Sequence, residues 1–197
     1  SERQRTLERP VGYFLAGHRE VRITNPCAIL FDAPSREVRA YVGSAGFLDA
    51  AILGQVDGVT ARRSPGSALK PFLYALAMDQ GLIHPRSLLR DSRLSFGDYN
   101  PENFDRTLVG PIPACDALYH SRNIPAVSLM SRLHPPGFYR FLKDAGVALP
   151  KPETFYGLSL PLGGGEVSME ELGVLYSMLA DDGCPRPLRY RRDQFRW

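Results

Sequence analysis

The chain has 197 residues, of which 44% are hydrophobic and 23% are charged, enough for one domain or a large piece of a bigger one. Its 24 basic and 21 acidic residues leave a net charge of +3, and their scattered placement predicts a solvated surface with no nucleic-acid partner. No run reaches the roughly 18 apolar residues of a membrane span, and the cysteines match no metal-ligand spacing, so we expect neither metal nor cofactor.

The first third of the sequence predicts a helix followed by a β-hairpin. Within residues 2–18, apolar side chains recur at helical spacing, although Pro10 interrupts the pattern. Residues 28–31 and 38–42 predict two strands, and the turn-forming residues between them predict an antiparallel hairpin. Residues 43–63 show little periodicity and predict a loop.

The middle of the chain predicts one well-marked helix and one long irregular segment. Residues 67–81 place apolar side chains at the spacing of a half-buried helix that ends at Gly81. Pro71 must lie near its first turn, because proline lacks an amide hydrogen. Residues 90–113 are rich in Asp, Asn, Gly and Pro and predict a long loop, a kind of segment that is often functional.

The remaining residues predict several short helices. Apolar spacing predicts three of them: residues 114–120, 124–133 and 136–145. Ser168 and Glu171 form the pattern of a capping box and predict a fourth helix that ends near Gly183. An early hairpin followed by helices, with strands still to come, predicts the α+β fold class.

Ser67 and Lys70 lie three residues apart and therefore share one face of the predicted helix. At a helix start, unpaired backbone N–H groups and the helix dipole would favour negative charge on the Ser67 oxygen and lower the pKa of Lys70. An amine with a lowered pKa beside a hydroxyl can activate a serine nucleophile. The alternative is a serine N-cap with a surface lysine one turn later, since about one S-x-x-K match arises by chance in such a chain.

Ser121, Arg122 and Asn123 form an S-x-N triplet at a break between two predicted helices. The hydroxyl and the carboxamide can face one cleft, where the serine would relay a proton and the asparagine would hold a substrate amide. The alternative is that Ser121 or Asn123 caps the next helix. S-x-x-K together with this triplet makes two of the three motifs that mark penicillin-recognising serine enzymes.

Five segments, in this order, carry a resemblance to one family: residues 38–44, 63–72, 99–105, 121–127 and 162–167. Together they resemble the transpeptidase domain of class A penicillin-binding proteins, the bifunctional murein synthases, and most of all their 1C subgroup. The resemblance implies the serine penicillin-recognising fold, an antiparallel sheet flanked by helices. It also implies an enzyme at the periplasmic face of the bacterial inner membrane that cross-links peptidoglycan and is acylated by β-lactam antibiotics.

The resemblance assigns catalytic roles to residues of both motifs. Ser67 would attack the carbonyl of a D-Ala-D-Ala stem peptide, and Lys70 would take its proton. Ser121 would pass a proton to the leaving D-Ala nitrogen. Asn123 would hold a stem-peptide amide. The backbone N–H of Ser67 would supply half of an oxyanion hole.

The loop at residues 99–105 adds Tyr99 and Asn103 to the resemblance as substrate-binding residues. The partners would be β-lactams and the stem peptides of nascent or lipid-linked glycan strands, with no metal or cofactor. A membrane anchor and a glycosyltransferase domain would lie outside residues 1–197.

The third motif of the family, Lys-Thr-Gly or Lys-Ser-Gly, does not occur in the sequence. The only lysines are Lys70, Lys143 and Lys151. In the family this motif lies on an edge strand, where it binds the substrate carboxylate and adds the second oxyanion donor. Residues 195–197 could be the start of such a strand. We therefore expect a partial transpeptidase domain, incomplete at its C-terminal side and inactive by itself.

Two other functions are compatible with these motifs. A module that kept the fold without the third motif would recognise penicillin or peptidoglycan without catalysis. A serine β-lactamase would share the chemistry but need a deacylating base, a role that the sequence does not assign to Glu102 or Glu166. Spacing also leaves open a triad of Ser67 with a distant histidine, which no motif supports.

Overall fold

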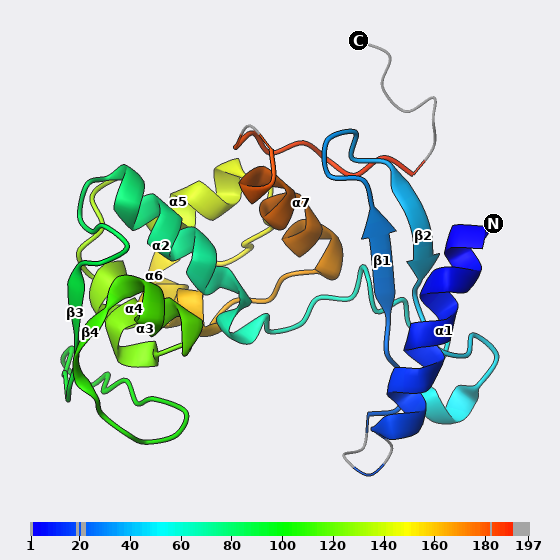
Figure 1. The fold of residues 1–197 in the computed structure, drawn as a ribbon, viewed down its shortest axis with the longest axis horizontal. Coiled ribbons are helices and arrows are strands. Elements are labelled where there is room, and N and C mark those ends of the chain that lie inside the picture. The colour runs from blue at the N-terminus through cyan, green and yellow to red at the C-terminus, as the bar shows by residue number, and fades with distance from the viewer. Residues whose placement is uncertain (1, 19, 21–22, 182, 191–197) are drawn as a thin grey trace. The chain divides into compact units, whose positions relative to one another are not determined.

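The computed structural model describes residues 2–18, 20, 23–181 and 183–190. The chain divides into two compact units, residues 1–63 together with 167–197, and residues 64–166. In Figure 1 the first unit holds the blue N-terminal elements and the orange α7 (Met169–Leu179), and the second holds the green and yellow helices. In the described residues, each unit combines helices with one two-stranded antiparallel sheet, which confirms the predicted α+β class.

In the first unit, β1 (Ala28–Phe31) and β2 (Val38–Val42) form the predicted hairpin. They pair antiparallel, with Ala28 opposite Val42, and their register is irregular between the last two residues of β1. Because side chains alternate along a strand, every second residue of β2 faces the core: Ala40 and Val42. One 3-10 turn, η2 (Ala50–Ile52), lies within the predicted loop that follows.

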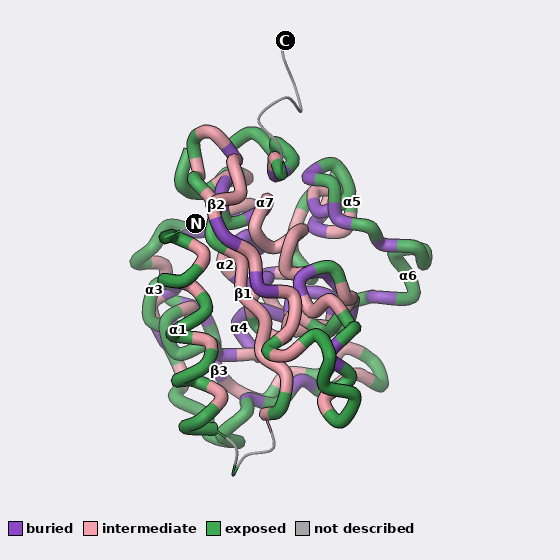
Figure 2. The backbone as a smooth tube through the Cα atoms, turned by 90° about the vertical axis from the view of Figure 1, so that its right-hand side faces the viewer, coloured by how far each residue is buried: buried purple, intermediate pink, exposed green. Residues whose placement is uncertain are grey.

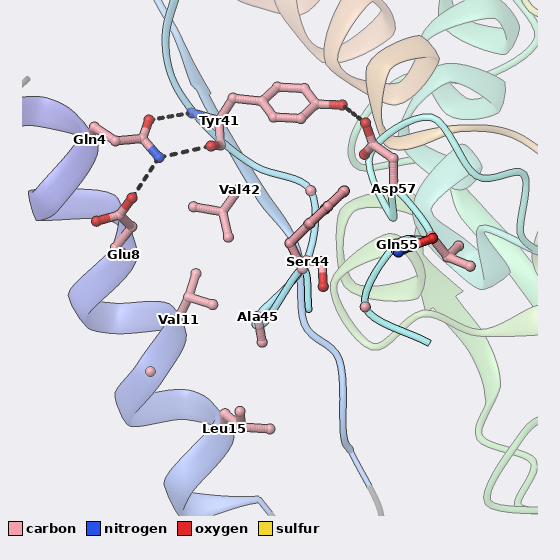
Figure 3. Close-up of a pocket in the computed structure, with 15 residues that line it drawn as sticks. Gln4, Glu8, Val11, Leu15, Tyr41, Val42, Ser44, Ala45, Gln55 and Asp57 are labelled. Carbon is pink, nitrogen blue, oxygen red and sulfur yellow. Dashed lines mark hydrogen bonds between the residues drawn. The ribbon is translucent and has the colours of Figure 1, made fainter. Parts of the chain in front are cut away.

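The predicted N-terminal helix is α1 (Glu2–Gly17), which lies against β2. None of its residues is buried, and Figure 2 shows it in green and pink only. The side chain of Gln4 binds the helix to the backbone of β2. It accepts a hydrogen bond from the N–H of Tyr41 at 3.0 Å and donates one to the Tyr41 carbonyl at 2.8 Å, the pair of bonds that a neighbouring strand would make. Figure 3 shows this pair beside a hollow of about 580 Å³, where the Tyr41 hydroxyl donates to Asp57. No predicted site residue lines this hollow.

The predicted capping box starts α7. The Ser168 hydroxyl accepts a bond from the Glu171 N–H at 3.1 Å, and the Glu171 carboxylate accepts one from the Ser168 N–H at 2.8 Å. That carboxylate also accepts two bonds from Arg62, at 2.9 and 3.0 Å, which hold the helix start in place. The helix ends at Leu179, before the stop predicted at Gly183.

In the second unit, η3 (Gly66–Leu69) and α2 (Lys70–Asp79) replace the single helix predicted from Ser67. In the 3-10 turn, the N–H of Lys70 donates to the Ser67 carbonyl. Pro71 has no N–H to give that carbonyl an α-helical bond, so residues 66–69 form a 3-10 turn and the α-helix begins at Lys70, with the proline in its first turn. The predicted apolar face is buried: Leu69, Phe72 and Leu73.

Three further predicted helices are present, as α3 (Ala114–Tyr119), α4 (Asn123–Met130) and α5 (Gly137–Asp144). α4 is largely apolar and most of its residues are buried, as the purple of Figure 2 shows, so it is the central helix of this unit. Two short elements were not predicted: α6 (Glu153–Tyr156) and η4 (Gly157–Leu162).

β3 (Leu88–Asp91) and β4 (Gly110–Pro113) pair antiparallel at the ends of the segment predicted as irregular. The prediction of an unbroken loop over residues 90–113 is therefore wrong at both ends. β4 reads Gly-Pro-Ile-Pro, and prolines cannot donate bonds to a ladder, so its sequence does not mark a strand. Residues 92–109, here called the 92–109 loop, connect the two strands, so the ends of this loop lie side by side.

No strand follows α7 among the described residues, and residues 195–197, expected to open one, lie outside them. None of the helices formed by the described residues is both long and apolar enough to cross a bilayer. All of the predicted site residues lie in the second unit.

Candidate active site

Lys70, the first residue of α2, lies at the centre of the predicted site and is 1% exposed. Its Nζ donates to the Ser121 carbonyl at 2.5 Å, to the Ser121 hydroxyl at 3.1 Å and to Asn123 Oδ1 at 2.7 Å. The structure thus brings Lys70 together with two other predicted site residues, Ser121 and Asn123, which follow it by 51 and 53 positions in the sequence.

The protonation of Lys70 is set by its surroundings. An ammonium group has three donors, and here each has an acceptor. Burial, and then the nearby positive charge of Arg122, lowers the pKa of Lys70 from its usual value of 10.5 to about 8. A neutral amine is therefore accessible at mildly alkaline pH, as a general base requires.

Ser67 lies one turn before Lys70 in η3, and it is exposed. Gly66 precedes it with a φ of 54°, a left-handed conformation that suits glycine and lets the chain turn sharply into the helix. The three bonds of the Lys70 amine go to Ser121 and Asn123 rather than to Ser67. The structure therefore presents a hydroxyl to solvent, one turn from a buried amine.

Ser121 adopts a left-handed conformation after α3, with a φ of 52°. Its N–H donates to the Leu118 carbonyl and the N–H of Arg122 donates to that of Ala117, the paired bonds of a Schellman motif. Glycine normally occupies this position, because a side chain in the left-handed region costs about 1–2 kcal/mol. Here the strained residue directs both its carbonyl and its hydroxyl to Lys70, so the strain lies within the site itself.

Arg122, the middle residue of the triplet, is buried, and its guanidinium is bonded to three residues. Its guanidinium donates to Asp91 at 2.7 Å, to Asp105 at 2.8 Å and to the Thr107 carbonyl at 2.5 Å. Asp91, the last residue of β3, is fully buried. Since an unpaired buried charge is costly, the Arg122–Asp91 pair fixes the triplet to β3, and the bonds to Asp105 and Thr107 fix it to the 92–109 loop.

Asn103, on the 92–109 loop, uses its whole side-chain amide inside the protein. Its Oδ1 accepts bonds from the backbone N–H groups of Asn123 at 2.8 Å and of Ile124 at 3.3 Å. Its Nδ2 donates to Asp91 at 2.7 Å and to the Thr107 carbonyl at 2.9 Å. Asn103 thereby caps the start of α4 from a distant loop.

Asn123 is oriented at both ends of its amide. Its Nδ2 donates to the Glu102 carbonyl at 2.8 Å, while its Oδ1 accepts the bond from Lys70. The residue at the N-cap position of α4 makes no side-chain cap. The first N–H groups of this helix donate to the side chain of Asn103 instead. The alternative interpretation, in which Ser121 or Asn123 caps this helix, is therefore wrong.

Two predicted substrate-binding residues have other described contacts. Tyr99 is half-buried, its backbone pairs with that of Phe96, and burial raises the pKa of its hydroxyl. Asn103 is 4% exposed and bonded as above. The proposal that these residues contact substrate stays a prediction.

Sequence reasoning missed the ionic support of the site: Asp91, Asp105 and Arg122. Two bonds from Thr107, and then Arg122, lower the pKa of Asp105 to about 2, so this carboxyl is ionised at neutral pH. The one available signal was the place of Arg122 inside the S-x-N triplet, between a catalytic candidate and an apolar helix.

The family model described as the penicillin binding protein transpeptidase domain matches residues 26–183. Penicillin-binding protein 1C of Escherichia coli (strain K12) is 42% identical over 166 residues, which cover 84% of this chain and 22% of that protein. Penicillin-binding protein 1F of Bacillus subtilis (strain 168) is 37% identical over 133 residues, 66% of this chain and 18% of that protein.

Solved structures share the fold. The penicillin-binding protein PonA1 from Mycobacterium tuberculosis matches 93% of this chain and 49% of its own, with a TM-score of 0.74 and 22% identity. The chain spans about a fifth of the length of the curated relatives that it matches. The chain therefore belongs to the transpeptidase domains of the class A penicillin-binding proteins, as its motifs suggested.

Proposed function

We propose that the protein is a serine D,D-transpeptidase, in which Ser67 forms an acyl-enzyme with D-Ala-D-Ala stem peptides and with β-lactams. The observation that carries this proposal is the buried Lys70 amine, bonded to Ser121 and Asn123 and one helical turn from the exposed Ser67. By analogy with the family, the reaction would take place on peptidoglycan at the periplasmic face of the inner membrane.

In the first step, the Ser67 hydroxyl gives its proton to the neutral Lys70 amine as its oxygen bonds to the carbonyl carbon of the substrate. Before it takes this proton, the neutral amine can donate only two hydrogen bonds, whereas the ammonium group donates three. One of the three present acceptors must therefore be released when Lys70 loses its proton. The Ser121 hydroxyl, at 3.1 Å, makes the longest of the three bonds and can donate as well as accept. It is therefore suited to exchange a proton with the amine.

In the second step, the bond between the carbonyl carbon and the D-Ala nitrogen breaks, and the proton passes from Lys70 through Ser121 to that nitrogen. An acceptor amine then attacks the ester, loses its proton along the same route, and restores the Ser67 hydroxyl. The backbone N–H of Ser67 would support the oxyanion, and one such donor contributes on the order of 3 kcal/mol. Asn103 would act on the substrate through its hold on Asn123.

A fluorescent penicillin tests the proposal in the full-length protein. We expect covalent labelling of the wild type and of the control Ser131→Ala, an exposed serine elsewhere in the unit, and none of Ser67→Ala. Labelling that persists in Ser67→Ala refutes the nucleophile. Fast loss of the label would indicate a β-lactamase, and no labelling of the wild type would indicate a non-catalytic module.

A further inference from the structure

A hollow of about 500 Å³ adjoins Asn123 in the second unit. Three of the residues that line it are tied to Asn123: Glu102 accepts the bond from its amide, Asn103 accepts the bond from its backbone, and Ile124 follows it in the chain. Since Asn123 Oδ1 is bonded to Lys70, its Nδ2 end, at Glu102, leads toward the hollow. A peptide held by Asn123 would therefore pass close to this hollow.

The hollow carries an excess of positive charge. Arg93 and Arg106 line it, and within the part of the chain that the structure describes, neither guanidinium has an ion pair or a hydrogen bond. Glu102 is the one acidic residue of its lining. The neighbouring carboxylates of Asp91 and Asp105 both pair with the one guanidinium of Arg122, so the positive excess belongs to the lining itself and not to its wider surroundings.

The backbone that carries Arg106 is held in place before any ligand arrives. Arg106 has a φ of 57°, an uncommon conformation for a residue with a side chain, and its N–H donates to the Asn103 carbonyl at 2.9 Å. The next residue, Thr107, is bonded to Asp105 by its N–H and hydroxyl, and its carbonyl accepts from Asn103 and Arg122. A wall fixed in this way loses little further backbone entropy when a ligand binds.

We propose that this hollow is a carboxylate subsite, in which Arg93 and Arg106 bind a side-chain carboxylate of the donor peptide on the segment before its scissile bond. The inference rests on the proposed function, because it places the peptide along Asn123. A guanidinium is suited to this ligand, since its planar fork matches a carboxylate with two parallel hydrogen bonds. Glu102 would at the same time disfavour a second carboxylate in the hollow.

Two donor peptides test the subsite in the full-length protein. Both end in D-Ala-D-Ala, and they differ only in a carboxylate or a carboxamide on the side chain before that dipeptide. We expect the wild type to release D-Ala from the carboxylate peptide with a kcat/KM about tenfold higher than from the carboxamide peptide. This factor is at the low end of what charge-assisted hydrogen bonds contribute, because both arginines are exposed to solvent. The preference should fall with rising ionic strength.

The variant Arg93→Gln with Arg106→Gln should bring the ratio between the two peptides close to one, whereas Arg106→Lys, which keeps the charge, should retain part of it. Arg132→Gln removes an exposed arginine that does not line the hollow, and it should keep the wild-type ratio. Because the ratio is taken within one variant, partial loss of folded protein does not change it. A ratio in the double variant equal to that of the wild type overturns the subsite. Failure of penicillin to label the wild type overturns the proposed function instead.

Discussion

The side-chain oxygen of Asn103 lies 2.8 Å from the backbone nitrogen of Asn123, which follows 20 residues later in the chain. Through this bond the 92–109 loop caps α4 at the residue whose own amide meets Lys70. The Glu102 carbonyl, one residue before Asn103, holds the other end of that amide. The loop and the S-x-N triplet therefore act as one piece in setting the geometry around the Lys70 amine.

Replacing Asn103 by alanine should damage both folding and acylation. The substitution leaves two N–H groups at the start of α4 and one oxygen of the buried Asp91 without a partner. Since each buried unsatisfied group costs about 1–3 kcal/mol, we expect the free energy of unfolding to fall by roughly 2–4 kcal/mol. Urea denaturation measures this loss, and stopped-flow reaction with a chromogenic β-lactam measures the slower acylation. Asp98→Ala, an exposed site on the same loop, is the control, and equal stability of both variants would contradict the capping role.

The buried pair Asp91–Arg122 should show strong energetic coupling. Arg122→Met leaves the carboxylate of Asp91 without its counter-charge in the interior, a change that costs about 3–5 kcal/mol. Asp91→Asn should cost less, because Arg122 keeps its ion pair with Asp105. The double variant removes both charges, so we expect it to lose clearly less than the sum of the single variants. Urea denaturation of the wild type, the two single variants and the double variant completes this double-mutant cycle.

An exposed pair on α5 offers a matched control. Arg140 and Asp144 lie one helical turn apart, with side chains 63% and 57% exposed. Solvent screens such a pair, so Arg140→Met and Asp144→Asn should couple by less than about 0.5 kcal/mol. Coupling at Asp91–Arg122 as small as this would show that the pair does not support the site.

Local patterns predicted the parts of the fold whose contacts are local. The first hairpin and the apolar face after Ser67 follow the period of a strand or a helix, the capping box at Ser168 is a fixed spacing of three residues, and all three are present. The strand β4 carries two prolines and no alternation, so only its pairing with β3 reveals it.

The candidate site divides in the same way. The spacing of Ser67 and Lys70 predicted that they share a helical turn, whereas the meeting of Lys70 with Ser121 and Asn123 was expected only from the family resemblance. The cap provided by Asn103 crosses 20 residues and leaves no local signature. Arginine is rarely buried unless it is paired, so the burial of Arg122 could be predicted only by knowing that Asp91 lies beside it.

The rate of acylation should depend on pH through Lys70. Only the neutral amine can accept the Ser67 proton, and its pKa of about 8 means that the neutral fraction rises as the pH increases toward that value and levels off above it. We expect the β-lactam acylation rate to follow this curve between about pH 6 and 9. Lys70→Arg should abolish acylation, because a guanidinium stays protonated over this range. Lys143→Arg, on the exposed surface of α5, should keep the wild-type profile, and a flat profile in the wild type would exclude Lys70 as the base.

Ser121 allows its strain and its chemistry to be measured separately. At a φ of 52°, glycine fits without the penalty that a Cβ atom incurs, so Ser121→Gly should unfold with a free energy about 1 kcal/mol higher than Ser121→Ala. Both variants lack the hydroxyl that lies 3.1 Å from the Lys70 amine, so both should acylate more slowly, by about 100-fold if that hydroxyl relays the proton. Thermal or urea unfolding gives the first comparison and β-lactam acylation gives the second. Equal stability of the two variants would show that the turn is unstrained, and wild-type acylation rates in both would remove Ser121 from the proton route.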